Sequence, residues 1–155
     1  MNRIFRFAAA AAFACAAAFA QAAPVRVDVA ASGEGARAFE AYARRHLKAA
    51  LAEEGRGVLK VVQTPGSPSD CTMAVALGAR VERPVPGGVR YLQPYAVKIR
   101  DFRGRVFAVA HGTADWSSRA ETRRSDPSGK ICEIVCRRAA GILLGLFKPA
   151  AKAAP

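Results

Sequence analysis

Residues 97–107 read Val-Lys-Ile-Arg-Asp-Phe-Arg-Gly-Arg-Val-Phe, and this stretch indicates the fold more clearly than any other part of the chain. Apolar and basic residues alternate from Val97 to Arg100, which is the period of a strand with one buried face. Asp101 to Gly104 has the composition of a tight turn, and Val106 to Thr113 resumes the apolar pattern. The stretch therefore predicts an antiparallel β-hairpin.

The same alternation predicts further strands on the N-terminal side of this turn. The first strand of the hairpin extends back to Val89, and Pro94 within it indicates an edge position or a bulge. Prolines and glycines separate this strand from the earlier ones. The earlier strands are predicted at residues 25–31, 58–62 and 71–81.

Two segments have the spacing of amphipathic helices. Apolar residues recur every three or four positions from Phe39 to Leu51, and this helix is expected to end near Glu54. Asp126-Pro127 is a typical helix start, and apolar residues then keep helical spacing up to Phe147. The chain therefore contains one helix between the first two strands and one at its C-terminal end.

The resulting order is β-α-β-β-β-β-α, which predicts an α+β fold. We expect a two-layer sandwich in which two helices cover one face of a mostly antiparallel sheet. The other face of the sheet is then open to solvent. Basic residues of the strands at 71–81 and 89–99 alternate with the apolar ones, so this open face is expected to be basic.

The N-terminal residues 1–22 have the layout of a secretory signal peptide. Arg3 and Arg6 precede an apolar run of alanines and phenylalanines, and Ala20-Gln21-Ala22 matches a cleavage site. We expect a single α+β domain at 23–148 and a flexible tail at 149–155. An alternative makes Cys15 a lipidated residue, but Phe13 fits a lipobox poorly. The chain carries a formal charge of +12, of which the leader supplies two arginines, so most of the basicity belongs to the mature domain.

Three cysteines remain after the leader. Because exported proteins enter an oxidising compartment, we expect a disulfide that joins Cys71 to Cys132 or Cys136. Zinc binding by the cysteines with His46 or His111 is an alternative, but their spacing matches no zinc motif. We therefore expect no metal and no other cofactor.

The hairpin motif Asp-x-x-Gly-x-Val at residues 101–106, followed by a polar stretch and an alanine-rich C-terminal helix, is similar to a pattern in bacterial envelope proteins. The element order over residues 25–147 resembles the small α/β domains of the CsgG, TolB N-terminal and penicillin-binding-protein-activator families. The absence of a clear lipobox and the three mature cysteines depart from that pattern. The resemblance implies a periplasmic, non-catalytic domain that docks other proteins.

No catalytic motif is found in the sequence. His46 lies on the apolar stripe of the first helix and His111 near the end of a strand, and neither has a nucleophile placed beside it by a motif. Glu53 and Glu54 are adjacent at a helix end and face different ways. The pattern around Gly129-Lys130 lacks the glycine and the Ser/Thr of a phosphate-binding loop. We therefore expect a protein that is not an enzyme.

Arginine and lysine residues are the strongest candidates for partner binding, because they pair with phosphates and carboxylates. Tyr91, Tyr95 and Phe102 are expected near them. Since export makes nucleic acid an improbable ligand, we expect a non-catalytic interaction module of an envelope assembly in the periplasm or outside the cell. Alternatives are a binder of an anionic envelope polymer or lipid at the membrane periphery, and a small hydrolase that uses His111. The candidate binding residues are Arg80, Arg90, Lys98, Arg100, Arg103, Arg105, Arg119, Arg123 and Arg124.

Overall fold

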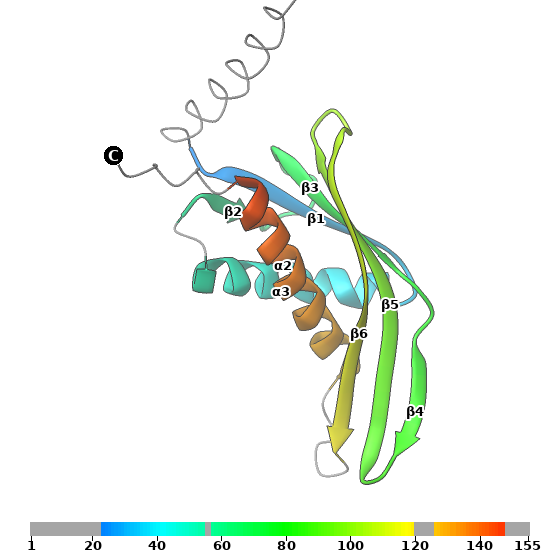
Figure 1. Cartoon of the computed structure of the whole chain (residues 1–155). Helices are drawn as coiled ribbons and strands as arrows, with labels where there is room; N and C mark the ends of the chain where they lie inside the picture. Colours follow the sequence, from blue (N-terminus) through cyan, green and yellow to red (C-terminus); the bar gives the residue numbers. More distant parts are fainter. Residues whose placement is uncertain (1–22, 55–56, 120–125, 148–155) are drawn as a thin grey trace, which may run out of the picture.

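The computed structural model describes residues 23–54, 57–119 and 126–147 (Figure 1). The predicted signal peptide, the predicted tail, and Arg123 and Arg124 lie outside the described residues. The described elements are β1 (Val25–Gly33), α2 (Ala36–Glu54), β2 (Leu59–Val61), β3 (Cys71–Leu77), β4 (Val81–Val85), β5 (Gly88–Asp101), β6 (Val106–Arg119) and α3 (Pro127–Phe147).

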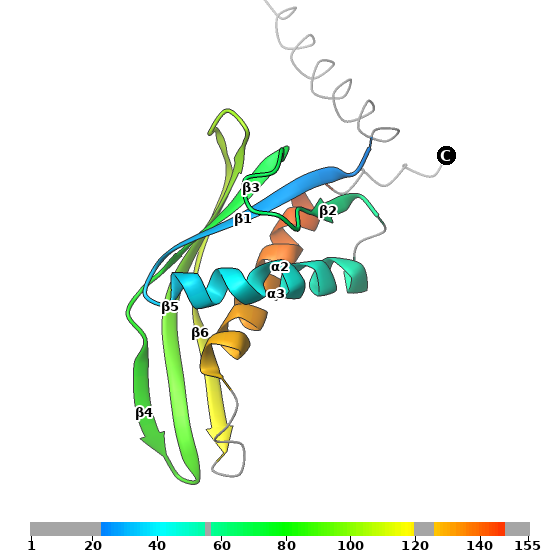
Figure 2. The same cartoon turned by 180° about the vertical axis from the view of Figure 1, so that it is seen from behind.

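The strands form one sheet, and both helices cover the same face of it (Figures 1 and 2). β1 pairs in parallel with β2 and β3, whereas β3, β4 and β6 all pair antiparallel with β5. The predicted α+β fold with two helices on one face is confirmed. The sheet is therefore mixed. α2 connects β1 to β2, and the loop at 62–70 connects β2 to β3, so that β2 and β3 both run parallel to β1.

The sheet has one strand more than the sequence pattern predicts. The expected strand 71–81 ends at Leu77, and the chain resumes as β4 on the other half of β5. At the break the Gly78 N–H donates to the Pro94 carbonyl at 2.8 Å. Pro94 has no N–H to continue the ladder, so it marks the point where β5 changes its partner from β4 to β3. The alternation of apolar residues continues across this break, which is why it predicted a single strand.

The core lies between the sheet and the two helices. Val27, Met73 and Ile99 are fully buried on neighbouring strands, and Leu47 and Leu143 bury the facing sides of α2 and α3. These are positions of the predicted apolar faces, so the inward side of each element follows from its periodicity. None of the helices formed by the described residues is long and apolar enough to cross a membrane.

Side chains of α2 close the edge of β1 beyond the short β2. Glu40 Oε1 accepts a hydrogen bond from the Ala31 N–H at 2.8 Å. Arg44 Nη2 donates to the Val29 carbonyl at 2.9 Å and lies 3.0 Å from Asp28 Oδ1. The helix thus satisfies backbone groups that a further strand would otherwise pair.

Candidate binding site on the open face of the sheet

The face of the sheet opposite the helices contains a hollow of about 280 Å³. It spans β1, β3 and β5, the strands at the centre of the sheet. Its lining is formed mainly by small side chains, with two long basic ones. The lining residues are Ala30, Ala31, Ser32, Ala74, Val75, Ala76, Ala96, Lys98 and Arg100.

The strand register explains why this region is hollow. Ala74 lies opposite Ala30 on one side and Lys98 on the other, and Ala76 lies opposite Ala96. Because residues directly opposite one another project from the same face, the alanine methyl groups form a shallow floor. Arg100 lies opposite Thr72 in the adjoining row. The site is therefore an alanine floor with a cationic border on β5.

Lys98 and Arg100 are exposed, and no acidic side chain among the described residues forms an ion pair with either of them. Their charges are therefore available to a ligand. The guanidinium of Arg100 can bind a carboxylate or a phosphate through two parallel hydrogen bonds, whereas Lys98 contributes a point charge. His111 extends the same face, since it lies opposite Ala96 on β6.

Three other predicted cations are engaged within the protein. Arg90 forms a bidentate pair with Asp115 across β5 and β6. Arg105 Nε lies 2.8 Å from Asp101 Oδ2, and the Arg105 side chain itself is exposed. This pairing, together with the N–H groups of residues 103 and 105, lowers the pKa of Asp101. The guanidinium of Arg103 lies 5.2 Å from the centre of the Phe102 ring.

Arg119 and Arg80, the other predicted cations among the described residues, do not line the hollow. Arg119 ends β6 at the opposite end of the hairpin from its turn. The prediction that Arg80 lies on the open face is wrong. Because β3 ends at Leu77, the chain turns and Arg80 Nη1 donates to the Ser128 hydroxyl of α3 at 3.3 Å. The structure thus brings only Lys98 and Arg100 of the described candidates to the hollow.

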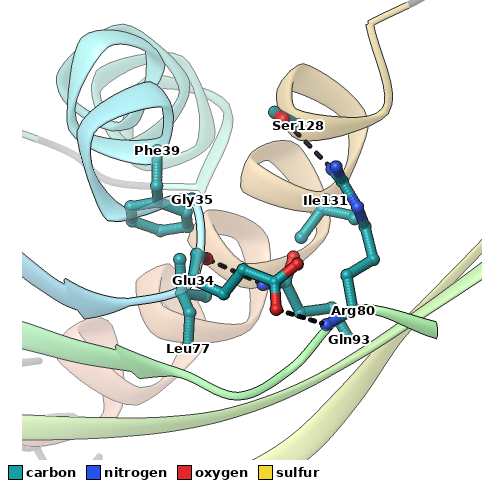
Figure 3. A pocket seen from close by; sticks show the side chains of 8 residues that line it. All are labelled: Glu34, Gly35, Phe39, Leu77, Arg80, Gln93, Ser128 and Ile131. Carbon is teal, nitrogen blue, oxygen red and sulfur yellow. Dashed lines mark hydrogen bonds between the residues drawn. The ribbon is translucent and has the colours of Figure 1, made fainter.

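Arg80 lines a second, smaller pocket of about 70 Å³ on the helix side of the sheet (Figure 3). The Gln93 amide donates to the carbonyls of Glu34 and Gly78 at 2.9 and 3.0 Å. The Arg80 N–H donates to Glu34 Oε2 at 3.3 Å. The pocket is small, and the polar side chains of Gln93, Arg80 and Glu34 in its lining already bind one another or nearby backbone groups. It joins the strand ends to α3 and is a poor ligand site.

Two of the three aromatic residues expected beside the cations, Tyr91 and Tyr95, project to the other face of the sheet. Tyr95 is 8% exposed and belongs to the core, and the Tyr91 ring stacks on Trp116 with 5.5 Å between the ring centres. Both tyrosines alternate with the residues of the open face and therefore project toward the helix side. Phe102, 74% exposed at the hairpin turn, contacts the predicted cation Arg103. None of the described residues that line the hollow is aromatic.

The predicted disulfide is not formed in the structure, where Cys71, Cys132 and Cys136 are free and buried. The thiols of Cys132 and Cys136 contact the Phe39 and Ala43 carbonyls of α2 at 3.5 and 3.6 Å. They thus face the neighbouring helix, an orientation that their spacing could not indicate. Burial raises the pKa of Cys71 to about 12. Within the described ranges no three His, Cys, Asp or Glu side chains gather as metal ligands.

The two histidines lie on different elements, His46 on α2 and His111 on β6. His46 is partly buried on α2, and burial together with the nearby Arg45 lowers its pKa. His111 is exposed on β6, and no hydrogen bond joins it to a described serine or cysteine. The sequence identified the basic border of the site. It did not reveal the hollow, because the curvature of the sheet and the alignment of alanines from three strands depend on long-range pairing.

Comparison with known proteins gives similarities of structure only. No family model and no curated protein matches the sequence. The hypothetical protein CT253 of Chlamydia trachomatis is 13% identical, with 82% of this chain and 99% of that chain covered and a TM-score of 0.51. The PelC dodecamer of Paraburkholderia phytofirmans is 17% identical, with 75% and 89% covered and a TM-score of 0.45. The lipoprotein GNA1162 of Neisseria meningitidis is 10% identical, with 77% and 99% covered and a TM-score of 0.45. At these identities the similarity to CT253 shows that the two chains share a fold.

Proposed function

We propose that this chain is a non-catalytic interaction module of the bacterial cell envelope that binds an acidic segment of a partner protein in the hollow of its open sheet face. The observation that carries the proposal is the combination of an alanine floor with the unpaired cations Lys98 and Arg100. The predicted signal peptide and the resemblance of the hairpin region to envelope domains support the compartment.

The lining of the hollow favours a polypeptide over the alternative ligands. A floor of methyl groups accommodates an extended backbone with small or aliphatic side chains, while the cationic border pairs with carboxylates. A sugar chain would be expected to stack on aromatic rings, and the described part of the chain places no aromatic ring in the lining of the hollow. Recognition of anionic lipid typically uses a cluster of roughly four to eight basic residues, and the hollow has two.

The proposal is tested by crosslinking from the hollow in the native envelope. A photoreactive amino acid at Ala96 should capture one defined protein through an acidic peptide of that protein. The same amino acid at Arg137, which is exposed on α3, is the positional control and should not capture it. The crosslinked peptides are identified by mass spectrometry.

Charge reversal distinguishes specific binding from general electrostatic attraction. The double substitution Lys98→Glu with Arg100→Glu should abolish capture, while Lys48→Glu on the helix layer should not. Circular dichroism of each variant checks that the fold is retained. Capture that is equal in the double variant would overturn the proposal, as would the recovery of glycan or lipid adducts in place of a protein.

A further inference from the structure

β6 has a long free edge. It is a strand of 14 residues, and among the described strands only β5 pairs with it. Figures 1 and 2 show β6 at the margin of the sheet. Val109 is 50% exposed on this strand and Val106 is 51% exposed. A long, apolar edge strand readily pairs with another strand, and natural proteins usually protect such edges.

The other edges of the sheet are protected in the usual ways. Side chains of α2 bind the backbone of β1, as described above. β4 has five residues and includes Arg83 and Pro84, and β2 has three residues and includes Lys60. Short length, proline and lysine all hinder edge-to-edge pairing. By contrast, residues 106–114 of β6 contain no charged residue and no proline.

The hydrogen-bond pattern identifies the backbone groups that face the free edge. The Pro94 carbonyl accepts from Gly78 and therefore points away from β6. In an antiparallel pair, residues whose backbone groups bond to the neighbouring strand alternate with residues whose backbone groups point away from it. Thr113 lies opposite Pro94, so the N–H and the carbonyl of Thr113 point away from β5 toward the free edge of β6. The same alternation turns the backbone groups of Val109, His111 and Asp115 to the free edge.

We propose that the free edge of β6 pairs with β6 of a second copy of this chain, antiparallel and about a two-fold axis at Thr113. This register overlaps nearly the whole strand. It places His111 opposite Asp115 and Val109 opposite Ser117, so no like charges face one another. The chain is strongly basic even without the two arginines of the predicted leader, so it repels its own copies over most of its surface. Residues 106–114 of this edge carry no charged side chain, and in the proposed register Asp115 and Arg119 lie opposite His111 and Phe107. Two-fold pairing also closes the assembly, because each copy uses its only long free edge among the described strands.

The dimer is independent of the proposed partner binding in the hollow. It uses the backbone of the β6 edge, whereas the hollow uses side chains of β1, β3 and β5. Substitution of Lys98 and Arg100 should therefore leave the dimer intact. Failure of the dimer would leave the crosslinking test at Ala96 unaffected.

The register is tested by crosslinking the purified exported protein through a new thiol. In the Thr113→Cys variant the two thiols lie next to one another at the axis, so a short bismaleimide should join them into a covalent dimer. Val81→Cys, at an exposed position on β4, is the control for random collision. Thr113→Cys should crosslink at least about tenfold faster, since its pairs are held in place. Equal rates for the two variants would overturn the proposed register.

The role of the backbone is tested with two substitutions at one position. His111→Pro removes an N–H that faces the free edge and leaves the β5 ladder intact, whereas His111→Ala keeps the N–H. Analytical ultracentrifugation over a concentration series should show dimers for the wild type and for His111→Ala. The proline variant should have a dimer Kd at least about tenfold higher, because a proline blocks edge pairing. A monomeric wild type, or a proline variant that dimerises equally well with an unchanged circular dichroism spectrum, would refute the proposal.

Discussion

Glu40 and Arg44, one turn apart on α2, bind backbone groups of the same strand edge. The Glu40 carboxylate accepts from the N–H of Ala31, and the Arg44 guanidinium donates to the carbonyl of Val29. α2 therefore has two roles. One side of the helix packs into the core, and Glu40 and Arg44 on the adjacent side bind β1 backbone groups that would otherwise pair with a further strand. This edge of the sheet is stabilised without a further strand.

We expect the substitution Arg44→Ala to lower the free energy of unfolding by about 2–3 kcal/mol, because hydrogen bonds to charged groups each contribute roughly 1.5–3 kcal/mol and Asp28 would lose its partner. The Arg44 side chain is 13% exposed and that of Asp28 is 17% exposed, so solvent replaces the lost contacts poorly. Urea unfolding measures the change. Arg137→Ala removes a pair whose arginine is 64% exposed, and it should cost less than about 1 kcal/mol. Equal losses in the two variants would contradict this explanation.

The hairpin turn should make stability depend on pH. Hydrogen bonds from Arg105 and Arg103 lower the pKa of Asp101 below its ordinary value of 3.8. A carboxylate of this kind stabilises the folded state above its unfolded pKa, and the contribution is lost as the pH falls through the lower folded pKa. The difference in stability between the wild type and Asp101→Asn should therefore be largest near neutral pH and shrink below about pH 4. Urea unfolding across this range measures it, and a difference that grows in acid would exclude this role.

The three mature cysteines should be unreactive while the protein is folded. Burial raises the pKa of Cys71 to about 12, and contact with Cys136 together with burial raises the pKa of Cys132. A maleimide should label none of the three in the native exported protein and all three after denaturation, because the thiolate is the reactive form. Intact mass and peptide mapping without reductant read the result. A bridge from Cys71 to Cys132 or Cys136 would instead support the disulfide that the sequence predicted.

Gly33 should tolerate no side chain. Its φ is 93°, and a Cβ at this position would lie 1.9 Å from the Leu77 carbonyl oxygen. Gly33→Ala is expected to destabilise the protein by more than about 3 kcal/mol, because backbone strain and a steric clash add together. Gly141→Ala is the control, since it has open space on α3 and should raise stability by up to about 1 kcal/mol. Thermal unfolding of the two variants compares them, and similar midpoints would contradict the prediction.

Local patterns predicted most of the fold, and contacts between distant segments account for what they missed. The turn at Asp101 to Gly104, both helices and the buried faces of the strands follow from periodicity within a few residues. The break between β3 and β4 at Gly78 involves contact with Pro94, which lies on β5, after β4 in the sequence. The local pattern around Gly78 therefore could not predict the break. The basic face was predicted too broadly for the same reason, because the partner that neutralises Arg90 lies on the next strand.

The stacked pair of Tyr91 and Trp116 determines what an optical experiment on this protein would report. Trp116 is the only tryptophan in the chain. It lies on β6 opposite Tyr91, in the part of β5 that pairs with β4. Its intrinsic fluorescence therefore reports on the end of the sheet where β4, β5 and β6 lie side by side. If the end frays before the helices melt, the emission should change at a lower denaturant concentration than the helical circular dichroism. Two non-coincident transitions would then reflect local opening of the hairpin in a domain whose core is still folded.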